Sequence, residues 1–247
     1  MVILGFFDHG VPGEFSYFSL AHLVPLILMG VLIYLSYLYR EQLRNWKHEY
    51  NLRIVFALVL LLSDNAYFWH KMYIGADIAN HLPVTVCGWA TIMSVFLLLT
   101  KKQGLFDIVY FFVLAGSINA LITPAVIIDN GPTHFRYYQF WTQHTGIFVA
   151  TFYMLFVHRF NINFKSMVKS FLVLIFLGVL AIYVNSNIAN ANYLFLATTE
   201  AGDSVLNFLP SNLGLRLLIM GGVIGFLYFL AYLPWIFINK KNKVEKV

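Results

Sequence analysis

The chain has 247 residues, of which 60% are hydrophobic and only 11% charged, and its formal net charge is +5. A soluble core cannot hold so much apolar surface, so this composition excludes a soluble globular protein and makes lipid the solvent for most side chains. A single cysteine, Cys87, excludes an intramolecular disulfide and a cysteine-rich metal site. We therefore expect one membrane-embedded helical domain over residues 1–247.

Seven segments are long and apolar enough to form helices that cross a bilayer, which requires about 20 mostly apolar residues each. In chain order they are Ser19–Tyr39, Leu52–Tyr73, Leu82–Thr100, Leu105–Ile128, Tyr137–His158, Met167–Ser186 and Leu213–Ile238. The predicted fold class is therefore all-α, a polytopic membrane protein built as a bundle of seven transmembrane helices.

Lysine and arginine gather on one side of these predicted helices. Thirteen lie in the loops after the first, third and fifth helices or in the C-terminal tail: Arg40, Arg44, Lys47, Arg53, Lys101, Lys102, Arg159, Lys165, Lys169, Lys240, Lys241, Lys243 and Lys246. The other side has three: Lys71, Arg136 and Arg216. Because short cytoplasmic loops are rich in positive charge, this distribution predicts the N-terminus outside and the C-terminus inside. It also accounts for the basic composition without a nucleic-acid partner.

Strongly polar residues within the predicted helices concentrate in their outer halves. Such residues are costly to bury in lipid, and they commonly mark functional sites. In chain order they are His22, Asp64, Asn65, His70, Cys87, Asn119, Thr123, Gln139, Gln143 and His144. The site candidates among them are Asp64, Asn65, Cys87, Asn119, Gln143 and His144. At a rise of about 1.5 Å per residue, Cys87 lies roughly 8 Å and His144 roughly 10 Å below the outer start of their helices. We therefore expect the thiol and the imidazole at similar depth.

Each of these residue types has a structural and a chemical interpretation. Cys87 either packs as a small apolar residue or acts as a nucleophile. His144 either joins two helices by a hydrogen bond or serves as the base for that nucleophile. Asp64 orients a histidine, donates as a protonated acid or binds a cation. Asn119 and Gln143 either stabilise an oxyanion or hold helices together. The residue types alone leave these alternatives open.

Several short motifs along the chain resemble those of a known family. They are F-S-L-A-H at Phe18–His22, L-P-V-T-V-C at Leu82–Cys87, T-K-K-Q-G-L-F-D at Thr100–Asp107, H-F-R-Y-Y-Q-F-W-T-Q-H at His134–His144, N-Y-L-F-L at Asn192–Leu196 and L-P-W at Leu233–Trp235. In this order, and across nearly the whole chain, they resemble the bacterial YwaF-type integral membrane family, related to the animal transmembrane protein 164. The resemblance implies a multi-pass protein of a bacterial cell membrane.

The resemblance also implies an activity. The animal relative is a cysteine-dependent acyltransferase that moves a fatty acyl chain from a phospholipid to a lysophospholipid. Cys87 matches its nucleophile and His144 its essential histidine, which implies an acyl-thioester intermediate in a site that opens toward the outer leaflet. The remaining candidates, for oxyanion stabilisation or for orienting the histidine, are Asn119, Gln143, Asp64 and Asn65.

The implied partners are membrane phospholipids and lysophospholipids, with no nucleic acid and no indicated protein partner. The chain has no glycine-rich phosphate loop and no H-x-x-x-H or H-E-x-x-H spacing, so we expect no cofactor and no metal.

A second class of function stays open. The same polar residues would line the intramembrane path of a small-molecule transporter or the pocket of a receptor. Transporters commonly have inverted repeats with matched broken helices, and Pro83 and Pro124 do not form such a matched pair. A retinal-binding receptor needs a lysine inside the last helix, whereas Lys240 follows it. A structural partner subunit is the third alternative, without specific support in the sequence.

Overall fold

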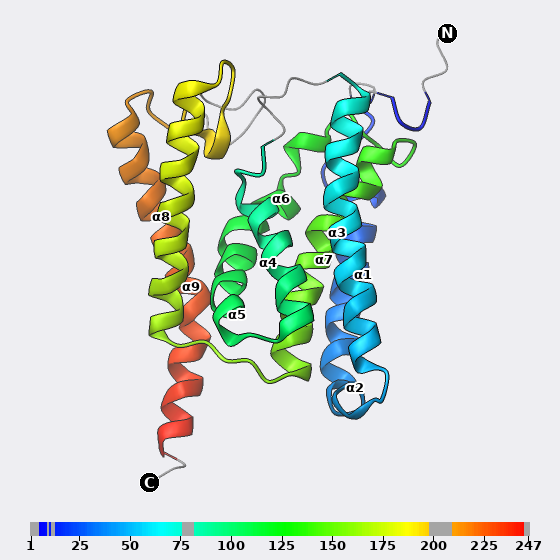
Figure 1. Cartoon of the computed structure of the whole chain (residues 1–247), viewed down its shortest axis with the longest axis vertical. Helices are drawn as coiled ribbons and strands as arrows, with labels where there is room; N and C mark the ends of the chain where they lie inside the picture. Colours follow the sequence, from blue (N-terminus) through cyan, green and yellow to red (C-terminus); the bar gives the residue numbers. More distant parts are fainter. Residues whose placement is uncertain (1–4, 9, 11–12, 76–81, 198–208, 245–247) are drawn as a thin grey trace.

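The computed structural model describes residues 5–8, 10, 13–75, 82–197 and 209–244 (Figure 1). These residues form helices and connecting segments without a β-strand, so the predicted all-α class is confirmed for them. Lys246, one of the basic residues used to predict the orientation, lies outside the described residues.

All seven predicted segments are helical. The helices are α1 (Leu20–Leu38), α2 (Arg40–Asn45), α3 (Glu49–Tyr73), α4 (Val86–Thr100), α5 (Gln103–Phe111), α6 (Ile118–Ile122), α7 (Phe135–Val157), α8 (Phe164–Asn187) and α9 (Leu213–Val244). A π-helix, η2 (Phe112–Ser117), joins α5 to α6 in one rod, and the short 3-10 turns are η3 (Ala125–Ile127) and η4 (Tyr193–Phe195).

The long helices run between two ends of the bundle (Figure 1). We call the end at which α1 begins, α3 ends and α7 begins the N-side. The opposite end, with α2 and the last turns of α9, is the C-side. This naming describes the molecule without reference to a membrane.

Five helical stretches are long and apolar enough to cross a membrane: Leu20–Leu38, Glu49–Tyr73, Gln103–Ile122, Phe164–Asn187 and Leu213–Asn239. Helix α4 is apolar but has only 15 residues. Helix α7 has 23 residues but includes an arginine, two glutamines and a histidine, all buried. It packs against α1, α3, α4 and α5, so its polar side chains face other helices rather than lipid.

Three helix boundaries differ from the sequence prediction by four residues or more. The last helix continues to Val244 rather than Ile238, so the prediction that Lys240 follows it is wrong. The other two differ because of proline and capping. The predicted third helix begins at Val86 rather than Leu82, since Pro83 favours extended backbone before it and Thr85 caps the helix by accepting a 3.0 Å hydrogen bond from the Gly88 N–H. The predicted fourth helix ends at Ile122 rather than Ile128, two residues before Pro124.

Arginines on the C-side satisfy the carbonyls at the ends of helices. Arg44 follows α1 in the short helix α2, which the sequence did not predict, and donates to the carbonyl of Val157 (2.5 Å) and that of Phe156 (3.1 Å) at the end of α7. Arg53 of α3 donates to the carbonyl of Leu98 near the end of α4. Positive charge at a helix C-terminus is favourable because the backbone dipole is negative there.

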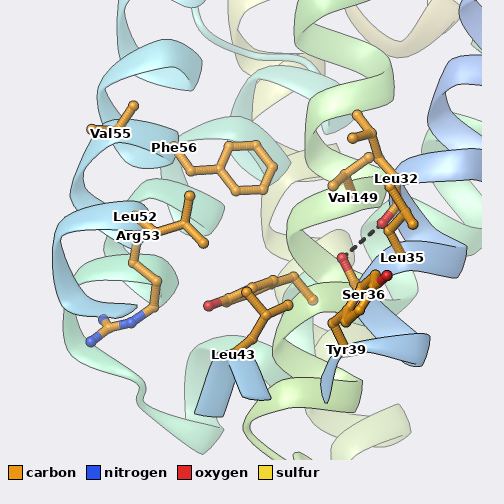
Figure 2. A pocket seen from close by; sticks show the side chains of 11 residues that line it. Leu32, Leu35, Ser36, Tyr39, Leu43, Leu52, Arg53, Val55, Phe56 and Val149 are labelled. Carbon is orange, nitrogen blue, oxygen red and sulfur yellow. Dashed lines mark hydrogen bonds between the residues drawn. The ribbon is translucent and has the colours of Figure 1, made fainter. Parts of the chain in front are cut away.

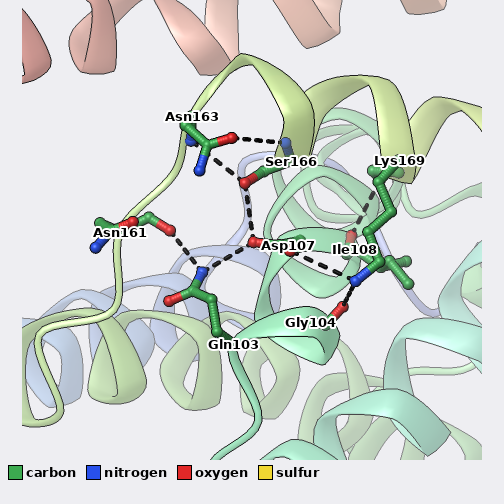
Figure 3. A network of polar contacts seen from close by, with 9 residues as sticks. Gln103, Gly104, Asp107, Ile108, Asn161, Asn163, Ser166 and Lys169 are labelled. Atoms are coloured by element: carbon green, nitrogen blue, oxygen red, sulfur yellow. Dashed lines mark hydrogen bonds and ion pairs between the residues drawn. The ribbon is translucent and has the colours of Figure 1, made fainter.

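A polar cluster around Asp107 joins α5 to α8 on the C-side (Figure 3). Asp107 Oδ1 accepts hydrogen bonds from Gln103 Nε2 (2.8 Å) and Ser166 Oγ (2.9 Å). Lys169 Nζ donates to the Gly104 carbonyl (2.7 Å) and lies 3.5 Å from Asp107 Oδ2. Since these partners come from both helices, the cluster fixes how α8 is placed against α5.

Candidate functional site

Hydrogen-bonded side chains join α3, α4 and α7 in the N-side half of the bundle. Gln143 Nε2 of α7 donates to Asp64 Oδ1 of α3 (2.7 Å) and to Thr91 Oγ1 of α4 (3.2 Å). Its Oε1 accepts from Gln139 Nε2 at 3.0 Å. Thr91 Oγ1 in turn donates to the backbone carbonyl of Cys87 at 2.9 Å. We call these five residues the central network. It joins Asp64 and Gln143, two of the supporting residues proposed from the sequence.

The central network continues toward the N-side through Arg136. Its guanidinium donates to Gln139 Oε1, while Gln139 Nε2 also donates to the Ser63 carbonyl (3.1 Å) and the Ser63 hydroxyl donates to the Gln139 carbonyl (3.2 Å). Ser63, Arg136, Gln139 and Gln143 are all buried. Buried polar groups of this kind are stable when their hydrogen bonds are made within the protein, and here α3 and α7 supply them to each other.

Cys87 is the second residue of α4, and its side chain is free and half-buried. Its thiol interacts with the hydroxyl of Ser117 and with its own backbone N–H. Ser117 is the last residue of η2 and is fully buried. The thiol thus lies at the N-terminus of a helix, where the backbone dipole is positive, beside one hydroxyl and one backbone N–H.

The π-helix determines which side chain meets the thiol. In η2 the Ser117 hydroxyl donates to the carbonyl of Phe112, five residues earlier, at 3.3 Å. A Cβ atom on the preceding residue, Gly116, would overlap the side chain of Val86 at the start of α4. Glycine at this position therefore allows η2 and α4 to approach closely, which brings Ser117 to Cys87.

His144 is buried on α7, with its ring stacked on Phe140 at a centroid distance of 4.1 Å. Its Nδ1 lies 2.9 Å from the Phe140 carbonyl. A carbonyl only accepts hydrogen bonds, so Nδ1 carries the proton and Nε2 of the neutral ring keeps its lone pair. Within the described part of the chain no hydrogen bond links His144 to Cys87; they belong to neighbouring helices joined by the Gln143–Thr91 contact.

Two of the predicted supporting residues lie away from the central network. Asn65 is exposed on α3 and its Nδ2 donates to the Leu61 carbonyl of the preceding turn at 2.8 Å. Asn119 is exposed on α6, and its side chain makes no hydrogen bond with any described residue. The structure thus places these two amides on the bundle surface and Asp64 and Gln143 inside it.

Sequence reasoning missed three residues of this region: Thr91, Ser117 and Arg136. Serine and threonine are common within membrane helices, so Thr91 and Ser117 gave no signal of their own. Arg136 did give one, because it is one of only three basic residues on the side that is poor in positive charge.

A separate pocket of about 460 Å³ lies on the C-side, between α1, α2, α3 and α7 (Figure 2). Its walls are mainly apolar, with Leu32, Leu43, Phe56 and Val149 among them, and it also includes Arg53. Phe56 precedes Asp64 by eight residues, about 12 Å along α3. The pocket is therefore well separated from Cys87 and is not part of the central network.

The donor groups of this region suit acyl chemistry better than metal binding. No group of three or more His, Cys, Asp or Glu side chains that could hold a metal ion occurs among the residues the structure describes. What the region offers is a thiol at a helix N-terminus with a hydroxyl beside it and an imidazole lone pair on the adjacent helix. A thiol and an imidazole base are groups that nucleophilic chemistry uses.

Comparison with known proteins gives one match. The family model described as the TMEM164 family matches residues 17–243. No curated protein and no solved structure matches the chain. The matched range begins just before α1 and ends in the last turn of α9, so it includes every candidate site residue.

Proposed function

This chain belongs to the TMEM164 family, and from that membership and the surroundings of Cys87 we propose that it is a membrane-embedded acyltransferase. In this proposal it moves a fatty acyl chain from a phospholipid to a lysophospholipid. The observation that carries the proposal is the position of the only thiol: at the N-terminus of α4, beside the Ser117 hydroxyl, next to the helix that carries His144.

The proposal includes a membrane topology. We take α1, α3, α4, the α5–α6 rod, α7, α8 and α9 as seven crossings, with the N-side outside a bacterial cell membrane. The five stretches that are long and apolar enough support the membrane location, and the thirteen basic residues predicted for one side support the orientation. Helix α4 is short, but its exposed side chains include the apolar Ile92, Phe96 and Leu99. Helix α7 is polar, but its charged and amide side chains are buried against other helices.

The first half of the reaction acylates the enzyme. His144 Nε2 takes the proton from the Cys87 thiol, and the sulfur attacks the ester carbonyl carbon of a phospholipid. The carbon–oxygen bond to the glycerol breaks, and the departing alkoxide takes the proton from His144. A lysophospholipid leaves, and the acyl chain remains on Cys87 as a thioester.

The second half returns the acyl chain to a lipid. The hydroxyl of an incoming lysophospholipid gives its proton to His144 Nε2 while its oxygen attacks the thioester carbonyl carbon. The carbon–sulfur bond breaks, and the thiolate takes the proton back from His144. In both halves the Cys87 N–H stabilises the thiolate, and the Ser117 hydroxyl does so by turning its single proton from the Phe112 carbonyl to the sulfur. Gln143 has both amide hydrogens engaged by Asp64 and Thr91, so we assign it to holding α3, α4 and α7 together.

The test is intact-protein mass spectrometry of the purified protein after incubation with phospholipid. Wild type should gain the mass of one acyl group, and hydroxylamine should remove it because thioesters are labile to this reagent. Cys87→Ala should gain nothing, and His144→Gln should acylate much more slowly. Ser94→Ala, a buried serine elsewhere on α4, serves as the matched control and should acylate like wild type.

Two results would contradict the proposal. One is an acyl adduct that persists in Cys87→Ala. The other is a wild-type protein without an adduct although its thiol reacts with an alkylating reagent. The second result would favour the transporter or receptor alternative, in which the polar residues serve a path or pocket that does not depend on the thiol.

A further inference from the structure

Three basic residues lie on the N-side, and one of them has a structural explanation. Arg216, at the start of α9, is only 2% exposed. Its Nε donates to the carbonyl of Pro210 at 2.9 Å and its Nη1 to the carbonyl of Phe195 at 3.1 Å. Arg216 thus joins α9 to η4 and serves as a link between chain segments.

Arg136 and Lys71 are different because both lie over the ring of Tyr67. The Arg136 Cζ atom is 4.5 Å and the Lys71 Nζ atom 5.7 Å from the ring centroid. Arg136 also lies 5.6 Å from the centroid of Phe140. The two positive charges are close enough to repel each other. Two cations therefore share one aromatic ring, where α3 ends and α7 begins.

Neither cation is neutralised by the protein in the part that the structure describes. Arg136 is 9% exposed, and its one hydrogen bond there is to the neutral amide oxygen of Gln139. Neither Arg136 nor Lys71 forms an ion pair with a described residue, and Asp64, the nearest acid on α3, accepts from Gln143 instead. Contact with aromatic faces attracts a cation but does not cancel its charge.

Arg53 is a buried arginine whose charge is paired within the protein, and it serves as a comparison for Arg136. It lies on the C-side, where its Nε donates to Glu49 Oε1 at 2.7 Å and its Nη1 donates to the Leu98 carbonyl. Since burying an unpaired charge is costly, the missing partner of Arg136 is best supplied by a bound anion. The planar guanidinium has free N–H groups for an anion with several oxygen atoms.

We propose that Arg136 and Lys71 bind the phosphate of a phospholipid headgroup. Lys71 is in the last turn of α3 and Arg136 in the first turn of α7, which is the depth at which headgroups meet the ends of membrane helices. Arg136 donates in the plane of its guanidinium to two phosphate oxygens, and Lys71 adds a point charge. Arg136 is also close enough for its charge to act on His144, so the site holds a lipid beside the proposed reaction centre.

This inference rests on the proposed function only in assigning the bound lipid as a reactant. Binding itself needs no thiol chemistry, so Cys87→Ala should bind phospholipid as tightly as wild type. A failure of acylation with intact binding would overturn the proposed function alone. If a lipid without the phosphate binds as tightly as the phospholipid, this inference alone is overturned.

The test measures binding by native mass spectrometry of the full chain in a mild detergent. The probes are dioleoyl phosphatidylethanolamine, dioleoylglycerol and inorganic phosphate. For wild type and Cys87→Ala, we expect the phospholipid to bind about tenfold more tightly than the diacylglycerol, which lacks the phosphate. Inorganic phosphate should bind weakly, because it lacks the apolar chains. If it binds as tightly as the phospholipid and displaces it, the site is one for free phosphate and the lipid assignment is wrong.

Variants locate the site. Arg136→Gln and Lys71→Gln should each weaken phospholipid binding by about tenfold and leave diacylglycerol binding unchanged. Lys102→Gln, an exposed lysine on the C-side, is the charge-matched control and should bind like wild type. Lys71 is half-buried, so Lys71→Gln decides the question if Arg136→Gln does not fold. Unchanged phospholipid binding in a folded Lys71→Gln variant, or equal binding of both lipids to wild type, would overturn the inference.

Discussion

The side-chain amide of Gln143 on α7 donates a 2.7 Å hydrogen bond to Asp64 Oδ1 on α3. The same nitrogen reaches Thr91 on α4, and the Gln143 oxygen accepts from Gln139. One residue thereby satisfies polar groups on two other helices. The geometry of the central network depends on Gln143 more than on any other of its members.

Replacing Gln143 with leucine should therefore destabilise the protein. Leucine has nearly the same volume but makes none of these bonds, and it leaves the half-buried Asp64 without its partner. We expect a loss of about 2 kcal/mol in the free energy of unfolding, which corresponds to a fall of about 5 °C in melting temperature. Thermal unfolding in detergent measures this. The control is Asn65→Leu, which removes only a bond within the exposed turn of α3. Equal losses of stability in both variants would show that the central network does not account for the loss in Gln143→Leu.

The Ser117 hydroxyl should control the reactivity of Cys87. Ser117→Ala removes a donor to the thiolate, and hydrogen bonds to charged groups are among the stronger ones, so alkylation of the thiol by iodoacetamide should slow by about tenfold. Mass spectrometry over time measures the rate. Ser94→Ala is the matched control, since the Ser94 hydroxyl has no hydrogen-bond partner among the described residues; it should react like wild type and unfold at the same or a higher temperature. A wild-type rate in Ser117→Ala would remove Ser117 from the site.

Gly116 should not tolerate a side chain. A methyl group there overlaps Val86 of α4, so Gly116→Ala should cost about 2 kcal/mol of stability and change the reactivity of the adjacent thiol. Adding Val86→Ala removes the obstructing methyl groups, and the double variant should recover most of the loss. Melting temperatures of the single and double variants test this, and additive losses would contradict the proposed contact.

On the C-side, Glu49 should be essential for stability. Its Oε1 accepts from Arg53 (2.7 Å), Tyr153 (3.0 Å) and His158 (2.7 Å). Glu49→Ala leaves the buried Arg53 without its counter-charge, which should cost about 3 kcal/mol or more in the free energy of unfolding. Denaturation in detergent measures the loss.

Glu41 provides the comparison for Glu49. Hydrogen bonds from Arg159 and Arg44 lower the pKa of the Glu41 carboxyl, but this group is exposed to solvent. Exposed ion pairs contribute little because water screens them. Glu41→Ala should therefore leave the melting temperature nearly unchanged, and a loss as large as that of Glu49→Ala would mean that burial does not distinguish the two.

The sequence predicted the helices well and the site only in part, for different physical reasons. Apolar length is fixed by the bilayer, so each of the seven predicted segments is helical, whereas the ends depend on local caps such as Thr85. Depth along a helix follows from the rise per residue, which is why the sequence predicts Cys87 and His144 at similar depth. Rotation about the helix axis depends on the neighbours, so the sequence did not reveal that Asn119 faces outward.

The distribution of basic residues along the sequence indicates more than the orientation of the chain. Lys71, Arg136 and Arg216 are the basic residues on the side that is poor in them. Basic residues are disfavoured on this side, so each one is expected to have a specific role. Arg216 has a structural one, because it donates hydrogen bonds to two backbone carbonyls. No pattern in the sequence shows that Lys71 and Arg136 meet at Tyr67, because residues 67 and 136 come together only when α3 packs against α7.

The number of residues in the π-helix η2 also determines two contacts at once, one with Cys87 and one with α1. A π-helical turn amounts to one residue inserted into an α-helix, so deleting one residue within Phe112–Ser117 would allow a regular helix and rotate all that follows by about 100°. Ser117 would turn away from the thiol, and so would the Leu121 carbonyl that lies 2.8 Å from His22 Nε2 of α1. Such a deletion, read out by thiol alkylation and melting temperature, should impair both contacts at once. A substitution such as Gly116→Ala or Ser117→Ala acts on the surroundings of the thiol, whereas a change in the residue count of this segment also moves the contact with α1.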